Sequence, residues 1–236
     1  SAPRILGHEM SGEIVSVGEK VKAFVSVKSF NNSDYIVMST KNGMIKRSPL
    51  SMYSRPRRGG IYAIEIREGD GLIEAKVSQN DQDIILATHK GKSIRFKEND
   101  VRPTGRKTMG VRGIRLSTKE DRVIGMLVIK REGSILVVTD KGFGKRTNID
   151  DYRTQNRGGK GVITIKTTEK VGNLIDIMEA IDGDDLMLIT DQGIMIRQPV
   201  EHIRIIGRNT QGVKLINLNN KASIASVTKV VSPFAS

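Results

Sequence analysis

The chain has 236 residues, of which 37% are apolar and 4% aromatic, and it contains no cysteine. The lack of cysteine excludes a disulfide framework and a thiolate metal site. The formal net charge of +13 favours a polyanionic partner, with nucleic acid first and simple solubility as the alternative. No apolar stretch approaches the roughly 20 residues that cross a membrane, which favours a cytoplasmic protein.

In chain order, the N-terminal stretch is half a structural unit, in which Arg4-Ile5-Leu6 resembles a third strand and residues 21–27 a fourth. Short apolar runs bounded by Gly, Asp and Lys then predict strands buried on both faces. Each ends at a glycine turn that predicts a hairpin. These first strands are residues 34–38, 83–86, 134–138 and 185–189.

The second strand of each hairpin is shorter and alternates in polarity, as in residues 44–47, 93–96 and 195–197. This alternation predicts one buried face, with the arginine pointing outward. A long basic loop follows, then a third strand at residues 61–66 and its equivalents. The predicted fourth strands are residues 72–77, 123–128, 174–178 and 224–227.

These four strands recur at a period of roughly fifty residues, which is typical of a β-propeller blade. The predicted fold is all-β, a β-propeller or β-pinwheel of four-stranded blades in one domain spanning residues 1–236. It would hold four complete repeats and an N-terminal partial blade. The predicted boundaries are 1–32 for the partial unit, then 33–80, 81–131, 132–182 and 183–231.

The basic side chains fall into two sets that keep register with the repeats. Arginines stand four residues after each hairpin glycine, at Arg47, Arg95, Arg146 and Arg197, and Lys46, Lys92 and Lys145 lie beside them. The loops add Arg57, Arg58, Arg102, Arg106, Lys107, Arg153, Arg157, Lys160 and Arg208. Guanidinium groups and glycine backbone amides suit phosphate oxygens. Because few aromatic residues are available to stack on unpaired bases, duplex DNA is the predicted partner.

Other sites receive less support. Gly91-Lys92-Ser93 lies in a hairpin and lacks the first glycine of a phosphate-binding P-loop. His8, His89 and His202 belong to different units, so no metal or catalytic site is predicted. Two alternatives stay open: a propeller that binds an acidic protein, and an enzyme with its site in the central channel. The second needs converging carboxylates or histidines, whereas the repeats place mostly Ile, Val and Leu there.

Several runs carry a resemblance to one family. Gln155-Asn156-Arg157-Gly158-Gly159-Lys160-Gly161 is one residue away from the Gln-Arg-Arg-Gly-Gly-Lys/Arg-Gly box of DNA gyrase A. Residues 108–116, 141–147 and 206–213 also resemble the C-terminal domain of that protein, and the likeness extends from about Ile5 to Val231.

The resemblance implies a five- or six-bladed pinwheel in which neighbouring blades exchange strands and a basic rim bends and wraps duplex DNA. It implies a non-catalytic, monomeric module of a bacterial, nucleoid-associated, ATP-dependent topoisomerase that introduces negative supercoils. Its partners would be DNA, gyrase B and the N-terminal region of gyrase A. The module itself would need no cofactor, since ATP and Mg²⁺ would act elsewhere in the holoenzyme.

Two departures bear on these expectations. The family's box belongs to its first blade, whereas here the similar heptad lies in the third complete repeat with Asn156 at a basic position. Either a first blade precedes this sequence, or the chain is nearer to the corresponding protein of topoisomerase IV. The family's catalytic tyrosine lies in a separate region, and Tyr35, Tyr53, Tyr62 and Tyr152 lack that context. The chain is therefore not expected to cleave DNA alone.

Overall fold

The protein is described by a computed structural model covering residues 4–5, 23–27, 29–55, 60–219 and 222–230. Within these residues the structure is antiparallel sheet, with short 3-10 turns and no α-helix. Each of the four main sheets is built on a hairpin and is called here blade 1 to blade 4. The hairpins are β2 (Tyr35–Thr40) with β3 (Met44–Pro49), β6 (Asp83–Thr88) with β7 (Lys92–Lys97), β10 (Ser134–Thr139) with β11 (Phe143–Asn148), and β14 (Asp185–Thr190) with β15 (Met195–Pro199).

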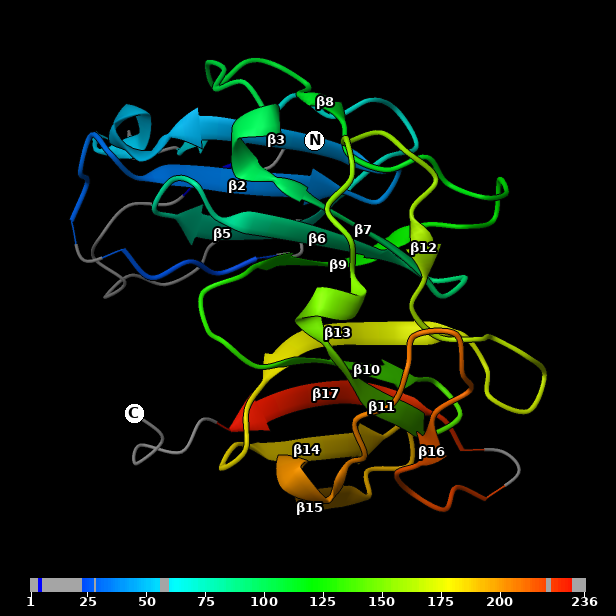
Figure 1. Cartoon of the computed structure of the whole chain (residues 1–236). Coiled ribbons are helices and arrows are strands. Elements are labelled where there is room, and N and C mark those ends of the chain that lie inside the picture. The colour runs from blue at the N-terminus through cyan, green and yellow to red at the C-terminus, as the bar shows by residue number, and fades with distance from the viewer. Residues whose placement is uncertain (1–3, 6–22, 28, 56–59, 220–221, 231–236) are drawn as a thin grey trace.

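An inner strand pairs with the first strand of each hairpin. The inner strands are β5 (Leu72–Ser78), β9 (Val123–Val128), β13 (Leu174–Ala180) and β17 (Ile224–Val230). Contacts join β5 to β9, β9 to β13 and β13 to β17, so this edge of each blade faces the middle of the array. Figure 1 shows the blades following one another from β2 and β3 at the top to β14 and β15 at the bottom.

The outer strand of a blade comes from the next repeat. It is β8 (Val111–Arg112) in blade 1, β12 (Val162–Ile163) in blade 2 and β16 (Val213–Lys214) in blade 3. Blade 4 has three strands within the described residues, and β4 (Ile61–Tyr62) pairs instead with β1 (Arg4–Ile5). The all-β blade architecture is confirmed, and so is the strand exchange that the resemblance implied.

Two strand predictions were wrong. The third strand was expected over residues 61–66, but β4 covers only Ile61–Tyr62, and its equivalents are equally short. The fourth strand expected over residues 21–27 is absent from residues 23–27, which have no strand pairing. Leu6, Val21 and Lys22 of the predicted partial unit lie outside the described residues.

The hairpin glycines explain why the exchanged strand can approach so closely. Gly91 has a φ of +75°, and a Cβ there would lie 2.3 Å from the carbonyl oxygen of Ile165, just beyond the exchanged strand β12. The Gly91 carbonyl also accepts a hydrogen bond from the amide of Thr164 at 2.9 Å. Gly43 and Gly142 accept equivalent bonds from the next repeat, so a hairpin glycine serves both its turn and the junction between repeats.

The apolar runs are buried on both faces because the blades stack. Ile84 and Leu86 join the core between blades 1 and 2, whereas Ile85 and Ala87 point into the core between blades 2 and 3. Leu136 and Val138 join the third core, against Leu186 and Leu188 of blade 4, and a further cluster covers the other face of blade 1. A blade cannot bury both of its faces alone, so the array is the stable unit.

Candidate nucleic-acid interface

The arginines in register connect successive repeats. Arg47, Arg95 and Arg146 each contact the 3-10 turn of the following repeat. These three turns are η2 (Glu98–Asp100), η3 (Ile149–Asp151) and η4 (Val200–His202), whereas η1 (Leu50–Tyr53) belongs to the first repeat. Arg95 donates from Nη1 to the carbonyl oxygens of Ile149 and Tyr152, at 2.9 and 3.2 Å. Its Nη2 lies 2.5 Å from Oδ2 of Asp83 in the same hairpin.

Arg47 and Arg146 are held in the same way. Arg47 forms an ion pair with Glu98 of η2 at 2.8 Å, and its guanidinium lies 3.7 Å from the centre of the Tyr35 ring. Arg146 donates from Nε to the Ile203 carbonyl at 2.7 Å and from Nη1 to Asp182 at 2.6 Å. The prediction that these arginines point outward was therefore wrong. Their charge is neutralised within the fold, where they clamp one repeat to the next.

Arg197 differs from the other three arginines in register because it is exposed. It pairs with Asp185 of its own hairpin, and its side chain is 65% exposed, against 6% for Arg146. No following 3-10 turn lies against it in the described part of the chain. An arginine at this position is therefore withdrawn from solvent only where the next repeat supplies oxygen acceptors for it.

The lysines beside these arginines are also not free at the surface. Lys46 and Lys145 are fully buried, so the expectation that they contact DNA beside the arginines was wrong, while Lys92 on β7 is half-buried. Burial lowers the pKa of Lys46 to about 8, and the positive charge of Arg106 adds to the effect. The pKa of Lys145 is lowered to about 8 for the same reason, with Arg208 as the nearby cation.

The basic loops lie on the blade that precedes them. The amide of Thr104 donates to the Arg47 carbonyl at 2.9 Å, and those of Gln155 and Ile206 make the equivalent bonds to Arg95 and Arg146. The loops thereby reach the outer edge together with the exchanged strands. Arg57 and Arg58 of the first loop lie outside the described residues.

Within these loops the cations differ in their freedom. Arg102, Lys107, Arg153 and Lys160 are exposed, and none of them pairs with a carboxylate among the described residues. Arg106, Arg157 and Arg208 are half-buried. Arg157 donates to the carbonyls of Asp100 and Arg112, and Arg208 to that of Ile163, so these two fasten their loops to the exchanged strand of the preceding repeat.

The box-like heptad forms a tight loop over blade 2. Gly158 has a φ of +78° and donates to the Gly113 carbonyl at 2.6 Å, while the Gly159 carbonyl accepts from the amide of Arg115. The side chains of Asn156 and Lys160 are exposed. The loop thus contacts the preceding exchanged segment through its backbone and leaves a lysine and an amide at the surface.

Four further cations lie on or just after the exchanged strands and were missed. Arg112 and Lys214 end β8 and β16, and Arg115 and Lys166 follow β8 and β12; all four are exposed. The sequence signal was present, since these residues stand two or five places after the closing glycine. This signal was not used because the sequence reading along the chain placed the third strand of each repeat inside its own blade. In the structure, strand exchange places the third strand at the outer edge of the preceding blade.

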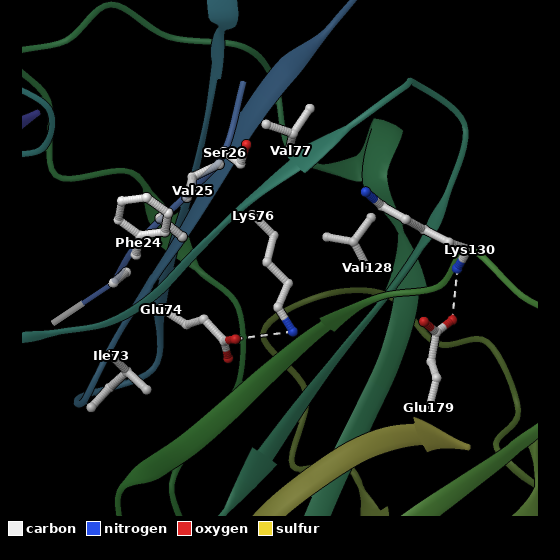
Figure 2. A pocket seen from close by; sticks show the side chains of 12 residues that line it. Phe24, Val25, Ser26, Ile73, Glu74, Lys76, Val77, Val128, Lys130 and Glu179 are labelled. Atoms are coloured by element: carbon white, nitrogen blue, oxygen red, sulfur yellow. Dashed lines mark hydrogen bonds and ion pairs between the residues drawn. The ribbon is translucent and has the colours of Figure 1, made fainter. Parts of the chain in front are cut away.

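The inner edge of the array holds a different set of charges. A cavity of about 570 Å³ lies along β5, between Phe24 and Ile73 on one side and Val128, Lys130 and Glu179 on the other. Figure 2 shows Glu74 and Lys76 pointing toward each other, and Glu179 directed at the backbone nitrogen of Lys130. The inner strands therefore carry more acidic residues than the mostly apolar lining expected from the repeats.

These acidic side chains have protein partners. Glu74 accepts from the amide of Met126 and pairs with Lys76 at 2.9 Å. Burial raises the pKa of Asp176 on β13 to about 7, opposed by a hydrogen bond from the Ile177 amide and assisted by the charge of Glu74. Within the described residues, no group of three or more His, Asp or Glu side chains is placed to hold a metal ion.

Stacked antiparallel blades that exchange an outer strand define a β-propeller of the pinwheel kind, and its outer edge is basic. The family model described as DNA gyrase C-terminal domain, beta-propeller, matches residues 34–79, 82–130, 133–179 and 184–230. The chain belongs to this family, as its sequence motifs indicated. No helix in the described part of the chain is long and apolar enough to span a membrane.

Individual relatives agree with this assignment. DNA gyrase A of Chlamydia pneumoniae is 38% identical over 221 residues, which cover 93% of this chain and 26% of that protein. DNA gyrase A of Escherichia coli K12 is 39% identical over 215 residues, covering 91% of this chain and 24% of that protein. The chain thus spans about a quarter of the length of these relatives.

Two solved structures share the fold. The DNA gyrase A C-terminal domain matches with a TM-score of 0.82 and 24% identity, covering 93% of this chain and 73% of the other. The C-terminal domain of DNA topoisomerase IV matches with a TM-score of 0.81 and 24% identity, covering 87% of this chain and 64% of the other.

Proposed function

We propose that this chain binds duplex DNA along its outer rim and bends it, without reading the base sequence. The rim is defined here as the exposed cations of the basic loops and of the exchanged strands with the residues just after them: Arg102, Lys107, Arg112, Arg115, Arg153, Lys160, Lys166 and Lys214. One observation carries the proposal. None of these cations forms an ion pair among the described residues, whereas each arginine in register does.

Repetition supports bending as well as binding. Loops and exchanged strands present rim cations on blades 1, 2 and 3 in turn, so a duplex that follows the rim meets positive charge repeatedly. Bending a short duplex through a large angle costs on the order of several kcal/mol. Many phosphate contacts spread along a curved surface can offset that cost. Arg157 and Arg208 hold their loops and retain further N–H donors for phosphate, and the half-buried Arg106 adds a third guanidinium.

Within the family context, we infer that the chain serves as the C-terminal module of DNA gyrase A. In the holoenzyme, with gyrase B and the rest of gyrase A, wrapped DNA would be passed through the enzyme to give negative supercoils. DNA cleavage and ATP hydrolysis, with its Mg²⁺, would belong to those other parts, in the bacterial cytoplasm. The full-length relatives favour gyrase over topoisomerase IV, whose C-terminal domain shares the fold.

Fluorescence polarisation with a random-sequence duplex of about 40 base pairs tests the binding proposal. The logarithm of affinity should fall linearly with the logarithm of salt concentration, by about 0.9 per neutralised phosphate. Replacing Lys107, Lys160 and Lys214 together with Gln should reduce that slope by nearly 3. Lys130→Gln removes one charge from the inner edge and should leave the slope unchanged. An affinity that is indifferent to salt, or no binding at moderate salt, would favour the acidic-protein alternative.

Wrapping requires a second measurement. Nicked circular DNA is ligated with the chain bound, and the linking number of the product is compared with that of free DNA. A shift that is lost in the Lys107, Lys160 and Lys214 triple variant supports bending by the rim. Tight binding with an unchanged linking number would contradict the wrapping part of the proposal alone.

A further inference from the structure

The buried lysines occur on alternate blades. Lys46 in blade 1 and Lys145 in blade 3 stand three residues after their hairpin glycines, and both are fully buried. The same position holds Ile94 in blade 2 and Ile196 in blade 4. A fully buried ammonium is costly unless its N–H groups are paired, so the lysines need partners that isoleucine does not.

Those partners are mostly oxygens of the basic loop above. Lys145 donates from Nζ to the carbonyls of Gly207 and Arg208, at 2.7 and 2.5 Å, and to the Thr210 hydroxyl at 3.0 Å. Lys46 donates to the Arg106 carbonyl at 2.5 Å and to that of Ala63 at 2.8 Å. In both blades the ammonium therefore lies directly beneath a loop arginine.

The loops above the lysines share a sequence that the third loop lacks. Gly105–Gly110 and Gly207–Gly212 both read Gly-Arg-X-Thr-X-Gly, and in each the threonine hydroxyl bonds the first glycine's carbonyl. The loop over Ile94 reads Asn-Arg-Gly-Gly-Lys-Gly instead. There a Cβ on Gly159 would lie 3.4 Å from Cδ1 of Ile94. Among the described loops, a lysine therefore lies under each Gly-Arg-X-Thr-X-Gly loop, and an isoleucine lies under the loop with paired glycines.

We propose that Lys46 and Lys145 are positioning residues that fix the Arg106 and Arg208 loops for phosphate contact. In a planar trans peptide the carbonyl and the following N–H point in opposite directions. Because the ammonium of Lys145 draws the carbonyls of Gly207 and Arg208 toward itself, the N–H groups of Arg208 and Asn209 face away from it. Lys46 does the same for the N–H of Lys107.

The Arg208 loop thereby directs two carbonyl oxygens toward the buried ammonium and presents two consecutive amide donors beside its arginine, and the Arg106 loop presents one. Consecutive amides of this kind suit an anion such as phosphate. The loop over blade 2 has no ammonium beneath it and instead packs closely through its paired glycines. Along the rim, loops held by a buried ammonium on blades 1 and 3 therefore flank a loop held by backbone packing on blade 2. This inference rests on the proposed DNA binding for its purpose, but the loop geometry can be tested without DNA.

The test replaces the residue beneath the loop with Met in three blades: Lys46→Met, Lys145→Met and the matched control Ile94→Met. Amide hydrogen exchange of the free protein is followed in residues 104–109, 204–210 and 153–159. We expect exchange to accelerate at least tenfold in the loop above each replaced lysine, and to change little above Ile94→Met. Unchanged exchange in the lysine variants would overturn the inference, whether or not the wild-type chain binds DNA.

DNA binding provides the second readout. Since the buried ammonium touches no phosphate, Lys145→Met should weaken duplex binding several-fold while leaving the salt slope unchanged. A slope reduced by a full phosphate would contradict a positioning role. If Lys145→Met fails to fold, Thr210→Val removes one acceptor of the same ammonium and should accelerate exchange in residues 204–210 about threefold. Wild-type exchange in that variant would likewise refute the inference.

Discussion

The clamp formed by the arginines in register makes a sharp prediction, because one member of the set lacks its partner repeat. Arg146→Met and Arg197→Met delete the same group from the same repeat position. Arg146 is buried and bonded to the carbonyls of Ile203 and Glu201 in the next repeat. Arg197 is 65% exposed and pairs only with Asp185 among the described residues. The first substitution should therefore destabilise the chain far more than the second.

The expected magnitudes follow from these contacts. A hydrogen bond to a charged group contributes about 1.5–3 kcal/mol, and a buried carbonyl left without a donor adds a desolvation cost of about 1–3 kcal/mol. The Asp182 carboxylate is 72% exposed and returns to water at little cost. We therefore expect Arg146→Met to lower the free energy of unfolding by about 3 kcal/mol. Loss of the exposed Arg197 pair should cost less than about 1 kcal/mol.

Urea denaturation monitored by circular dichroism measures both changes, and calorimetry checks whether the array unfolds in one transition. At roughly 2–4 °C per kcal/mol for a chain of this size, Arg146→Met should melt about 6–12 °C lower. Neither variant should alter the salt slope of DNA binding, since neither arginine belongs to the rim. Equal destabilisation by both substitutions, or a reduced slope for Arg146→Met in folded protein, would refute the clamp.

Two further predictions concern the exchanged strand and the inner edge. Gly91→Ala and Gly193→Ala impose the same backbone strain, at φ of +75° and +78°, but a Cβ at Gly193 meets nothing within 4 Å while one at Gly91 lies 2.3 Å from the Ile165 carbonyl oxygen. In urea denaturation, Gly193→Ala should lower the free energy of unfolding by about 1 kcal/mol and Gly91→Ala by at least twice as much. Equal losses would mean that the exchanged segment shifts to accommodate the added Cβ at little cost. Asp176→Asn removes a carboxyl whose pKa is raised from 3.8 to about 7, so the wild-type carboxyl stabilises the fold below pH 4 and loses that contribution as the pH rises through 7. The free energy of unfolding of the variant should equal that of wild type at pH 4 and exceed it by about 1–2 kcal/mol at pH 8, after allowance for solvent near this partly exposed side chain. Glu68→Gln, at an exposed position, is the control. A stability difference that does not grow with pH would contradict the raised pKa.

Much of the fold could be read from the sequence because it depends on local patterns. Apolar runs ending at Gly43, Gly91, Gly142 and Gly193 specify hairpins through burial and positive φ, and four copies in register specify an array. The run Ile84-Ile85-Leu86 also implied a strand covered on both faces. Stacked blades meet that requirement, with Ile84 and Ile85 in different cores.

The site was predicted less well, since a charge pattern does not say which charges are already neutralised. Arg146 and Arg197 occupy the same sequence position, and only the presence of Glu201 and Ile203 of the next repeat beside Arg146 separates a buried clamp from an exposed side chain. Lys145 was expected to contact DNA beside Arg146, because the carbonyls that receive its N–H groups lie more than sixty residues away in the chain.

The sequence by itself determined the hairpins, the repeat and the net positive charge, because short-range periodicity and composition suffice for these. Only the tertiary structure decided which cations face solvent. The pairing of β8, β12 and β16 with the preceding blade carries Arg112 and Lys214 to the rim. It also holds Arg47, Arg95 and Arg146 against the repeat that supplies the strand, with Arg47 and Arg146 buried and Arg95 half-buried. That choice rests on backbone hydrogen bonds between distant segments, which no local pattern encodes.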